Sequence, residues 1–244
     1  GAGGFFATEI LSALGADTLG SQFLEPDGMC PNHVPNPENA EAMRSIQSAV
    51  IKSKADLGLI FDTDVDRMSA VLPNPSNPSE AFEISRDSII ALISAVIARD
   101  YPNSTIVTDS VTSDRLTRFL ENVLGLKHHP FKRGYKNVIN ECKRLNENGI
   151  LSPLAMETSG HGALKENFYL DDGAFLAVKI IIALSRAKSQ GKNLLTLIDR
   201  LEPLVEAVEI RFKIKMEEAG ENFSSYGDKV LAGFKKNALA RKMN

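Results

Sequence analysis

Apolar and polar residues alternate along the first part of the chain with periods that predict two helices and a short strand. Phe5–Leu14 has apolar residues spaced as on one face of a helix, and Gly15 is expected to end it. Asp17–Gly20 follows as a predicted short strand. A longer helix is predicted from Pro37 to about Lys54, with Asn36 as its N-cap.

Two strands are predicted next, followed by a candidate domain boundary. Leu57–Phe61 is apolar throughout, which is typical of a strand buried in a parallel sheet. Met68–Leu72 is expected to continue the sheet beyond a tight loop. Pro73–Pro78 contains three prolines and two asparagines, and this composition predicts the break between two domains.

The remainder of the chain alternates between helix-like and strand-like segments. Such alternation predicts βαβ units with a parallel sheet and right-handed crossovers. Beyond residue 191 we expect a short helix, a strand at Val205–Lys215 and a helix near Ser224–Lys236. Between these two parts, the predicted helices are Ser85–Arg99, Thr112–Leu124, Tyr135–Glu147 and Asp172–Ala187, and the predicted strands are Thr105–Thr108, Lys127–Phe131 and Ile150–Met156.

These elements predict an α/β fold of two consecutive βαβ domains with mixed, mainly parallel sheets, followed by a truncated third unit. The expected ranges are 1–75, 76–190 and 191–244. The chain opens on Gly1–Gly4 with no strand before its first helix, so we expect the first strand of the first domain to be missing.

Composition narrows the class of partners and the compartment. The net charge of −3 provides no basic field that would attract nucleic acid or an anionic membrane. The longest apolar run, Ala177–Leu184, is interrupted by Lys179 and is too short to span a membrane. Cys30 and Cys142 are far apart and form no CxxC pair, which fits a reducing compartment. We therefore expect a soluble intracellular protein, in the cytosol or a plastid.

The first candidate site is the acidic loop after the predicted strand Leu57–Phe61. Asp62, Asp64 and Asp66 occupy alternate positions, and their charges would repel one another unless a cation lies among them. The loop is not an EF-hand, because its sixth position is Arg67 and its twelfth is a proline. It does not match the loop of haloacid-dehalogenase phosphatases either, which requires threonine or valine where Asp66 stands. A solvated acidic turn remains an alternative.

The second candidate site follows the predicted strand Ile150–Met156. Glu157, Ser159 and His161 place a carboxylate, a hydroxyl and an imidazole within five residues, with glycines that let the backbone bend. Such groups can hydrogen-bond neighbouring sugar hydroxyls, and we expect them to converge on a small cleft to which Glu157 is exposed. An ordinary turn with a helix N-cap is the alternative.

The third candidate site lies at a predicted strand-to-helix junction. Lys132, Arg133 and Lys136 surround Gly134 there. Helix N-terminal amides and fixed cations both favour an anion such as phosphate, so this junction is a candidate anion site. A solvated basic turn is the alternative.

In this order, these segments resemble the α-D-phosphohexomutase family over roughly residues 1–215. Asp62–Arg67 resembles the family's metal loop, Asp-Gly-Asp-Gly/Ala-Asp-Arg. Glu157–His161 resembles its sugar-recognition loop, Gly-Glu-x-Ser-Gly-His, from the glutamate onward. Arg133–Lys136 resembles a Thr-Gly-aromatic-Lys turn, and Asp171–Gly173 fits the opening of the following helix.

The resemblance implies a phosphoglucomutase or phosphomannomutase, an isomerase of carbohydrate metabolism. A phosphoserine would transfer its phosphoryl group to a hexose phosphate, and the reoriented bisphosphate would return the other phosphate. Four domains would surround a cleft, and this chain would hold the second, the third and the start of the fourth. The first and fourth domains of the same protein would thus be missing partners.

The resemblance also assigns roles to individual residues. Asp62, Asp64 and Asp66 would bind Mg²⁺, with Arg67 supporting their loop. The remaining assignments are Glu157, Ser159, His161 and Arg133 for substrate binding, and Lys132, Arg133 and Lys136 for phosphate contact or proton transfer.

The chain departs from the family pattern in two ways. Neither the serine loop (Thr-Ala-Ser-His-Asn-Pro) nor the distal phosphate loop (Arg-x-Ser-Gly-Thr-Glu) occurs in it, so we expect the chain alone to be inactive. Thr63 and Val65 replace glycines of the metal loop, at a cost of roughly 1–2 kcal/mol each if the loop requires positive φ. The alternatives are a non-catalytic sugar-phosphate-binding homologue, and a metal-dependent phosphatase whose nucleophile the sequence does not reveal.

Overall fold

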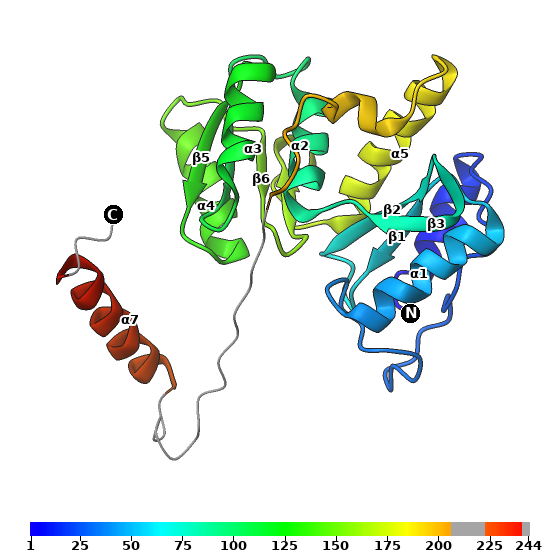
Figure 1. Ribbon diagram of the computed structural model, residues 1–244, viewed down its shortest axis with the longest axis horizontal. Coiled ribbons are helices and arrows are strands. Elements are labelled where there is room, and N and C mark those ends of the chain that lie inside the picture. Colours follow the sequence, from blue (N-terminus) through cyan, green and yellow to red (C-terminus); the bar gives the residue numbers. More distant parts are fainter. Residues whose placement is uncertain (206–222, 241–244) are drawn as a thin grey trace. The chain divides into compact units, whose positions relative to one another are not determined.

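The computed structural model describes residues 1–205 and 223–240 of the chain. Two compact units are present, Gly1–Pro203 and Leu204–Asn244 (Figure 1). The first unit contains both β-sheets and all three candidate sites. In the second unit, helix α7 spans Phe223–Ala240, which confirms the helix predicted near Ser224–Lys236. The predicted strand Val205–Lys215 lies outside the described residues except for Val205.

The N-terminal segment is helical, as predicted, but it contains a stretch of π-helix, η1 (Phe6–Leu11). No strand forms at Asp17–Gly20, which lies in turns and irregular backbone, so that prediction was wrong. Helix α1 spans Ala40–Ser53, and Asn39 rather than Asn36 is its N-cap. The Asn39 side chain accepts hydrogen bonds from two backbone amides of the first turn.

The first sheet is antiparallel, with strand order β1-β2-β3. Strand β1 spans Gly58–Phe61, β2 Met68–Asn74 and β3 Asn77–Glu83. The prediction of mainly parallel pairing was therefore wrong for this sheet, although the α/β class is correct. β1 is apolar because α1 packs on one of its faces and the main core of the unit on the other. One face is buried and the other partly buried, and this coverage, rather than parallel pairing, explains its composition.

The proline-rich stretch Pro73–Pro78 forms the turn between β2 and β3. Asn74 pairs with Asn77 across the hairpin, and the Asn74 side chain accepts from the Ser76 amide at 2.9 Å. Proline and asparagine favour a tight turn as much as a linker. The stretch is thus a turn inside the first sheet and not the link between domains that its composition indicated.

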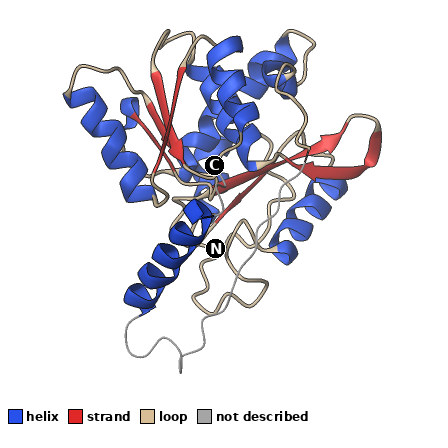
Figure 2. Ribbon diagram, turned by 60° about the vertical axis from the view of Figure 1, so that its left-hand side comes forward, coloured by secondary structure: helices blue, strands red, loops and turns tan. Residues whose placement is uncertain are grey.

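The second sheet is mixed and mainly parallel, as predicted, with strand order β5-β4-β6-β7. Figure 2 draws the strands in red and the helices in blue. β4 pairs in parallel with both β5 and β6, and β7 pairs antiparallel with β6. β6 is shorter than the predicted strand, and the three-residue β7 was not predicted. The bounds are Thr105–Asp109 for β4, Lys127–Phe131 for β5, Leu154–Met156 for β6 and Gly162–Leu164 for β7.

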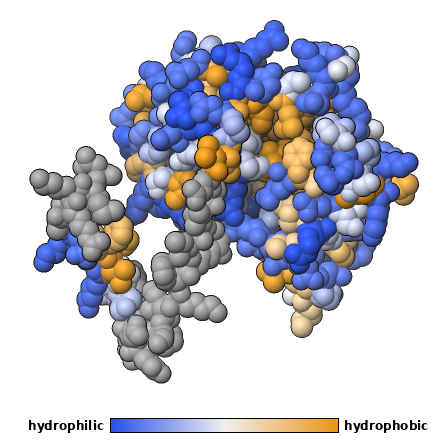
Figure 3. All heavy atoms as spheres, viewed as in Figure 1, coloured by the Kyte–Doolittle hydropathy of each residue, from blue (hydrophilic) through white to orange (hydrophobic). Residues whose placement is uncertain are grey.

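Helices cover both faces of the second sheet. On one face, Val138 and Cys142 of α4 pack against Val107 and Ala155. The other face joins a core that extends to the first sheet, and hydrophobic side chains show between α2 and α5 in Figure 3. The helix on the first face is α4 (Tyr135–Glu147). The second face is covered by α2 (Arg86–Ile97), α3 (Asp114–Arg118), the π-helix η2 (Phe119–Val123), α5 (Gly173–Ser189) and the 3-10 helix η4 (Leu194–Ile198), with a further 3-10 turn η3 at Lys165–Asn167.

Among the described residues, none of the helices combines the length and the apolar composition that a membrane span requires.

The strand order reverses at β4. From β4 the chain moves outward to β5 and then returns across β4 to form β6. Ligands of α/β proteins collect at such a switch point, beyond the carboxyl ends of the strands. Here those ends carry Asp109, the last residue of β4, and Glu157, which follows β6.

Candidate functional site

The acidic loop connects β1 to β2 and brings three carboxylates together. One oxygen each from Asp62, Asp64 and Asp66 lies within 4.8 Å of the others. Arg67 fixes the first of them, because its Nε lies 2.6 Å from one oxygen of Asp62 and its backbone amide donates to the other at 3.2 Å. Asp62 is buried and Asp64 is exposed, so the cluster opens toward solvent on one side.

Asp66 is the residue of this loop whose carboxyl group has a clearly raised pKa. Burial, followed by the negative charges of Asp62 and Asp64, raises its pKa to about 6. Its Oδ1 is buried and has no hydrogen-bond partner in the described residues. A divalent cation would offset the repulsion and coordinate this oxygen, and carboxylates are the ligands that hard cations prefer. The donor set therefore fits Mg²⁺ or a similar ion.

Of the two β-branched residues in the acidic loop, only one is strained. Val65 has φ of 67°, in the left-handed region, whereas Thr63 is not among the residues with positive φ. The condition for the predicted cost, positive φ, is therefore met at Val65 and not at Thr63. The Val65 carbonyl accepts a hydrogen bond of 3.0 Å from the amide of Gly173 at the start of α5.

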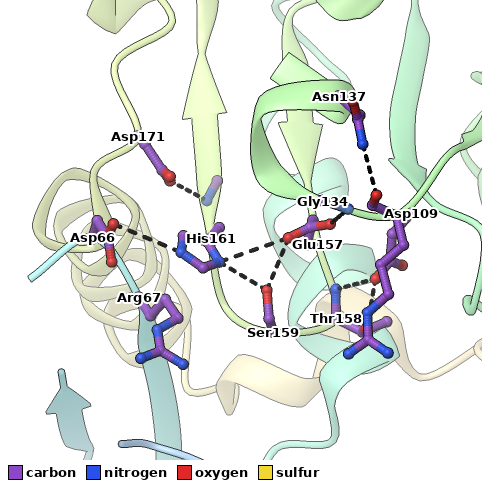
Figure 4. Close-up of polar contacts among 12 residues, drawn as sticks. Asp66, Arg67, Asp109, Gly134, Asn137, Glu157, Thr158, Ser159, His161 and Asp171 are labelled. Carbon is purple, nitrogen blue, oxygen red and sulfur yellow. Dashed lines mark hydrogen bonds and ion pairs between the residues drawn. The ribbon is translucent and has the colours of Figure 1, made fainter. Parts of the chain in front are cut away.

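The second candidate loop is the turn between β6 and β7, and it gathers its three polar side chains as predicted (Figure 4). The Glu157 amide donates to the His161 carbonyl at 2.9 Å and closes the turn. Ser159 Oγ lies 3.1 Å from Glu157 Oε2 and 2.8 Å from His161 Nδ1. Burial lowers the pKa of His161, and the negative charge of Glu157 partly opposes this effect.

Glu157 lines a pocket, but the residue is buried and not exposed as the sequence led us to expect. Only 5% of the residue is accessible, and its Oε1 accepts a 2.6 Å hydrogen bond from the Gly134 amide at the start of α4. The helix N-terminus favours a carboxylate at this place. The anion at the strand-to-helix junction is thus a side chain of the same protein.

The three basic residues of that junction are exposed. The Lys136 ammonium lies 5.8 Å from the centroid of the Tyr135 ring. The positive charge of Arg133 partly opposes the rise in the pKa of Asp109. Lys132 and Arg133 therefore remain accessible to an anion, although the amide of Gly134 is already bonded. The neighbouring turn Glu157–His161 is called the sugar loop below, after the family loop that it resembles.

Asp109 was not predicted from the sequence. It is fully buried, and its Oδ2 accepts a hydrogen bond of 2.7 Å from the hydroxyl of Thr158. This bond anchors the sugar loop to the end of β4. Its Oδ1 has no partner in the described part of the chain, and burial raises its pKa above the ordinary value. The sequence signal that could have revealed Asp109 is an acidic residue at the carboxyl end of a predicted strand.

Asp171 is a second carboxylate whose place in the site the sequence did not indicate. Its Oδ1 accepts from the Gly162 amide at 3.1 Å. Burial, followed by the negative charge of Asp66, raises its pKa to about 7. Asp66, His161 and Asp171 also offer ligand atoms within 4.8 Å of one another, so the acidic and sugar loops share one polar region.

The acidic loop and the sugar loop are in direct contact. The Met68 amide donates to the Gly160 carbonyl at 3.3 Å, and His161 Nε2 lies 3.6 Å from Asp66 Oδ2. Residues of both sheets, among them Met68 and Met156, line the pocket beside this contact, together with Glu157. Two loops separated by about ninety residues in the sequence therefore form one site.

Comparison with known proteins identifies the family. A model described as phosphoglucomutase/phosphomannomutase, alpha/beta/alpha domain II, matches residues 1–86, and the corresponding domain III model matches residues 85–204. The phosphomannomutase/phosphoglucomutase of Pseudomonas putida is 31% identical over 195 residues, covering 80% of this chain and 39% of that protein. The protein of the same name from Pseudomonas syringae pv. tomato is 30% identical over 238 residues, covering 95% and 48%.

A solved structure agrees with these relatives. A phosphoglucomutase/phosphomannomutase family protein from Burkholderia thailandensis superimposes with a TM-score of 0.70 at 27% identity, over 84% of this chain and 41% of its own. The chain thus spans less than half the length of each of these proteins. Two consecutive domain matches and the loop geometry lead to the same conclusion: the chain belongs to the phosphoglucomutase/phosphomannomutase family.

Proposed function

We propose that this chain is the metal- and sugar-binding part of a phosphohexomutase, an isomerase that interconverts hexose 1-phosphates and 6-phosphates. The observation that carries the proposal is the contact between the acidic loop and the sugar loop, with His161 Nε2 3.6 Å from Asp66 Oδ2. In such a site a metal-bound phosphoryl group and a sugar hydroxyl would lie side by side. A phosphoserine in a segment outside these 244 residues would supply the phosphoryl group.

Asp62, Asp64 and Asp66 would hold Mg²⁺. When bound, the ion supplies positive charge that stabilises the phosphoryl group during in-line transfer. Arg67 keeps Asp62 oriented through two hydrogen bonds, so one ligand is fixed before the ion arrives. The partnerless Oδ1 of Asp66 supports the assignment, because a buried carboxylate oxygen is otherwise costly.

Glu157, Ser159 and His161 would bind the sugar. The Glu157 carboxylate uses one acceptor position for Gly134 and one for Ser159, which leaves further lone pairs for substrate hydroxyls. His161 Nε2 faces Asp66 across 3.6 Å, where it can hold or release a proton at the reacting hydroxyl. The exposed Lys132, Arg133 and Lys136 would contact the non-reacting phosphate.

The test uses the longest natural chain that contains residues 1–244, assayed on glucose 1-phosphate and mannose 1-phosphate with a bisphosphate primer and Mg²⁺. We expect turnover, and a loss of about hundredfold or more in Asp64→Asn. Asp100→Asn, which changes an exposed aspartate far along the chain from the loop, is the matched control. Residues 1–244 alone should be inactive on both sugars.

Absence of turnover in the longer chain, or full activity of Asp64→Asn, would contradict the proposal. The choice between glucose and mannose follows from the ratio of the two kcat/KM values.

A further inference from the structure

The imidazole of His161 is held on its face by an aromatic ring. The rings of Tyr135 and His161 are stacked, with centroids 4.9 Å apart and planes inclined by 13°. Tyr135 is the first residue of α4, and His161 ends the sugar loop, so the contact joins two separate elements. Only 15% of the His161 side chain is accessible, although 38% of Tyr135 is.

The other polar contacts of His161 restrain the ring only loosely. Nδ1 lies 2.8 Å from Ser159 Oγ, and Nε2 lies 3.6 Å from Asp66 Oδ2. The second distance is longer than a hydrogen bond, so rotation of the ring about the Cβ–Cγ bond is limited mainly by the contact at Nδ1. A flat partner on the face removes this freedom, and stacked aromatic pairs are stabilised beyond the effect of their buried area.

Tyr135 is itself well placed to act as a fixed surface. The amide of Gly134, directly before it, donates to Glu157, so the same turn at the start of α4 contacts two of the three sugar-loop side chains. The Lys136 ammonium lies 5.8 Å from the ring centroid. Within the described residues, the Tyr135 hydroxyl has no hydrogen-bond partner. The contact with His161 therefore depends on the ring and not on the hydroxyl.

We propose that Tyr135 is a positioning residue that holds the plane of the His161 imidazole in the orientation needed at the reacting sugar hydroxyl. This inference rests on the proposed mutase function. It assigns Tyr135 no contact with the substrate, so its whole effect on turnover should pass through His161. A phenylalanine would serve as well as the tyrosine, whereas an aliphatic side chain would not.

A double-mutant cycle in the longest natural chain containing residues 1–244 tests whether the effect of Tyr135 on turnover passes through His161. We expect Tyr135→Leu to lower kcat about tenfold with KM and the thermal midpoint little changed, and Tyr135→Phe to retain most of kcat. In a His161→Ala background, Tyr135→Leu should have no further effect. Asn140→Ala, on the exposed surface of α4, is the matched control.

Equal losses from Tyr135→Leu in both backgrounds would overturn the inference, since Tyr135 would then contact the sugar or support the fold directly. Unchanged kcat in Tyr135→Leu would overturn it too. A lack of turnover in the parent protein would instead contradict the mutase function. The stack is therefore also tested by a second measurement that does not depend on enzyme activity.

That readout is the proton NMR signal of the His161 ring. Protons above the face of an aromatic ring are shielded, so the His161 signals should lie upfield in the parent protein and in Tyr135→Phe. They should move downfield in Tyr135→Leu. Identical shifts in all three proteins would show that the stack does not persist in solution and would overturn the inference whatever the activity.

Discussion

At the scale of single residues, the site concentrates both charge and backbone strain. Asp66 and Asp171 have pKa values raised to about 6 and about 7, in each case by burial first and by neighbouring carboxylates second. Val65, between two of the acidic residues, adopts a conformation that β-branched side chains avoid. Such strain persists only where surrounding contacts impose it, and the hydrogen bond from Gly173 to Val65 is one of these.

Replacing Val65 by asparagine should relieve the backbone strain. Asparagine tolerates the left-handed region, so we expect the free energy of unfolding to rise by about 1 kcal/mol. Urea denaturation measures the change. Thr63→Asn is the matched control, because Thr63 is exposed and has no positive φ, and it should stay within about 0.5 kcal/mol of the parent. Equal shifts for both variants would show that strain at Val65 is not the cause.

At the scale of elements, α4 connects the sugar loop to the second sheet. Its N-terminus is bonded to Glu157, and its apolar face packs on β4 and β6. Within the helix, Glu141 is buried and forms hydrogen bonds with Arg144 at 2.7 and 2.8 Å and with His129 of β5 at 3.0 Å. These bonds, the two from Arg144 foremost, lower the pKa of Glu141 from its ordinary value of 4.5.

A lowered pKa makes the contribution of Glu141 to stability dependent on pH. The contribution is present above the unfolded-state pKa of about 4.5 and is lost as pH falls through the lower folded-state value. Glu141→Gln should therefore be less stable than the parent at pH 7, and the difference should narrow below pH 4.5. Thermal midpoints measured between pH 3 and 8 test this, with buffer ranges chosen around that value.

The control for this series is Glu147→Gln, because Glu147 is exposed at the end of the same helix. It should stay within about 0.5 kcal/mol of the parent across the range. A difference for Glu141→Gln that stays constant down to the lowest pH would mean that the ion pair contributes nothing to stability.

At the scale of the whole first unit, two loops from different sheets are packed backbone to backbone. A Cβ atom at Gly173 would lie 2.8 Å from the Val65 carbonyl oxygen, and one at Gly160 would lie 2.7 Å from that of Met68. The start of α5 and the sugar loop thus both press against the acidic loop. A change at either contact should shift the three aspartates that are proposed to bind the metal ion.

Gly173→Ala should disturb the acidic loop without touching a carboxylate. We expect the free energy of unfolding to fall by about 1–3 kcal/mol, because a backbone atom must move to admit the methyl group. Binding of Mn²⁺, followed by paramagnetic relaxation of water, should weaken. Gly28→Ala is the control, since nothing lies within 4 Å of a Cβ there. Undiminished Mn²⁺ affinity in Gly173→Ala would show that the acidic loop is independent of α5.

The sequence by itself determined the α/β class, most element positions and the residues of the acidic and sugar loops. Strands such as Lys127–Phe131 and helices such as Tyr135–Glu147 were predictable because their periodicity and end signals are local. The hydroxyl, carboxylate and imidazole of Glu157–His161 were found for the same reason, since they lie within one turn.

Only the tertiary structure decided what depends on contacts between distant residues. The antiparallel pairing of β1 could not be inferred, because coverage of both faces gives the same apolar pattern as a parallel strand. The burial of Glu157 depends on the start of α4, twenty-three residues earlier. The stack of Tyr135 on His161 and the proximity of His161 to Asp66 likewise arise when separate elements pack together. The composition of a single segment does not indicate which distant residues will become its neighbours.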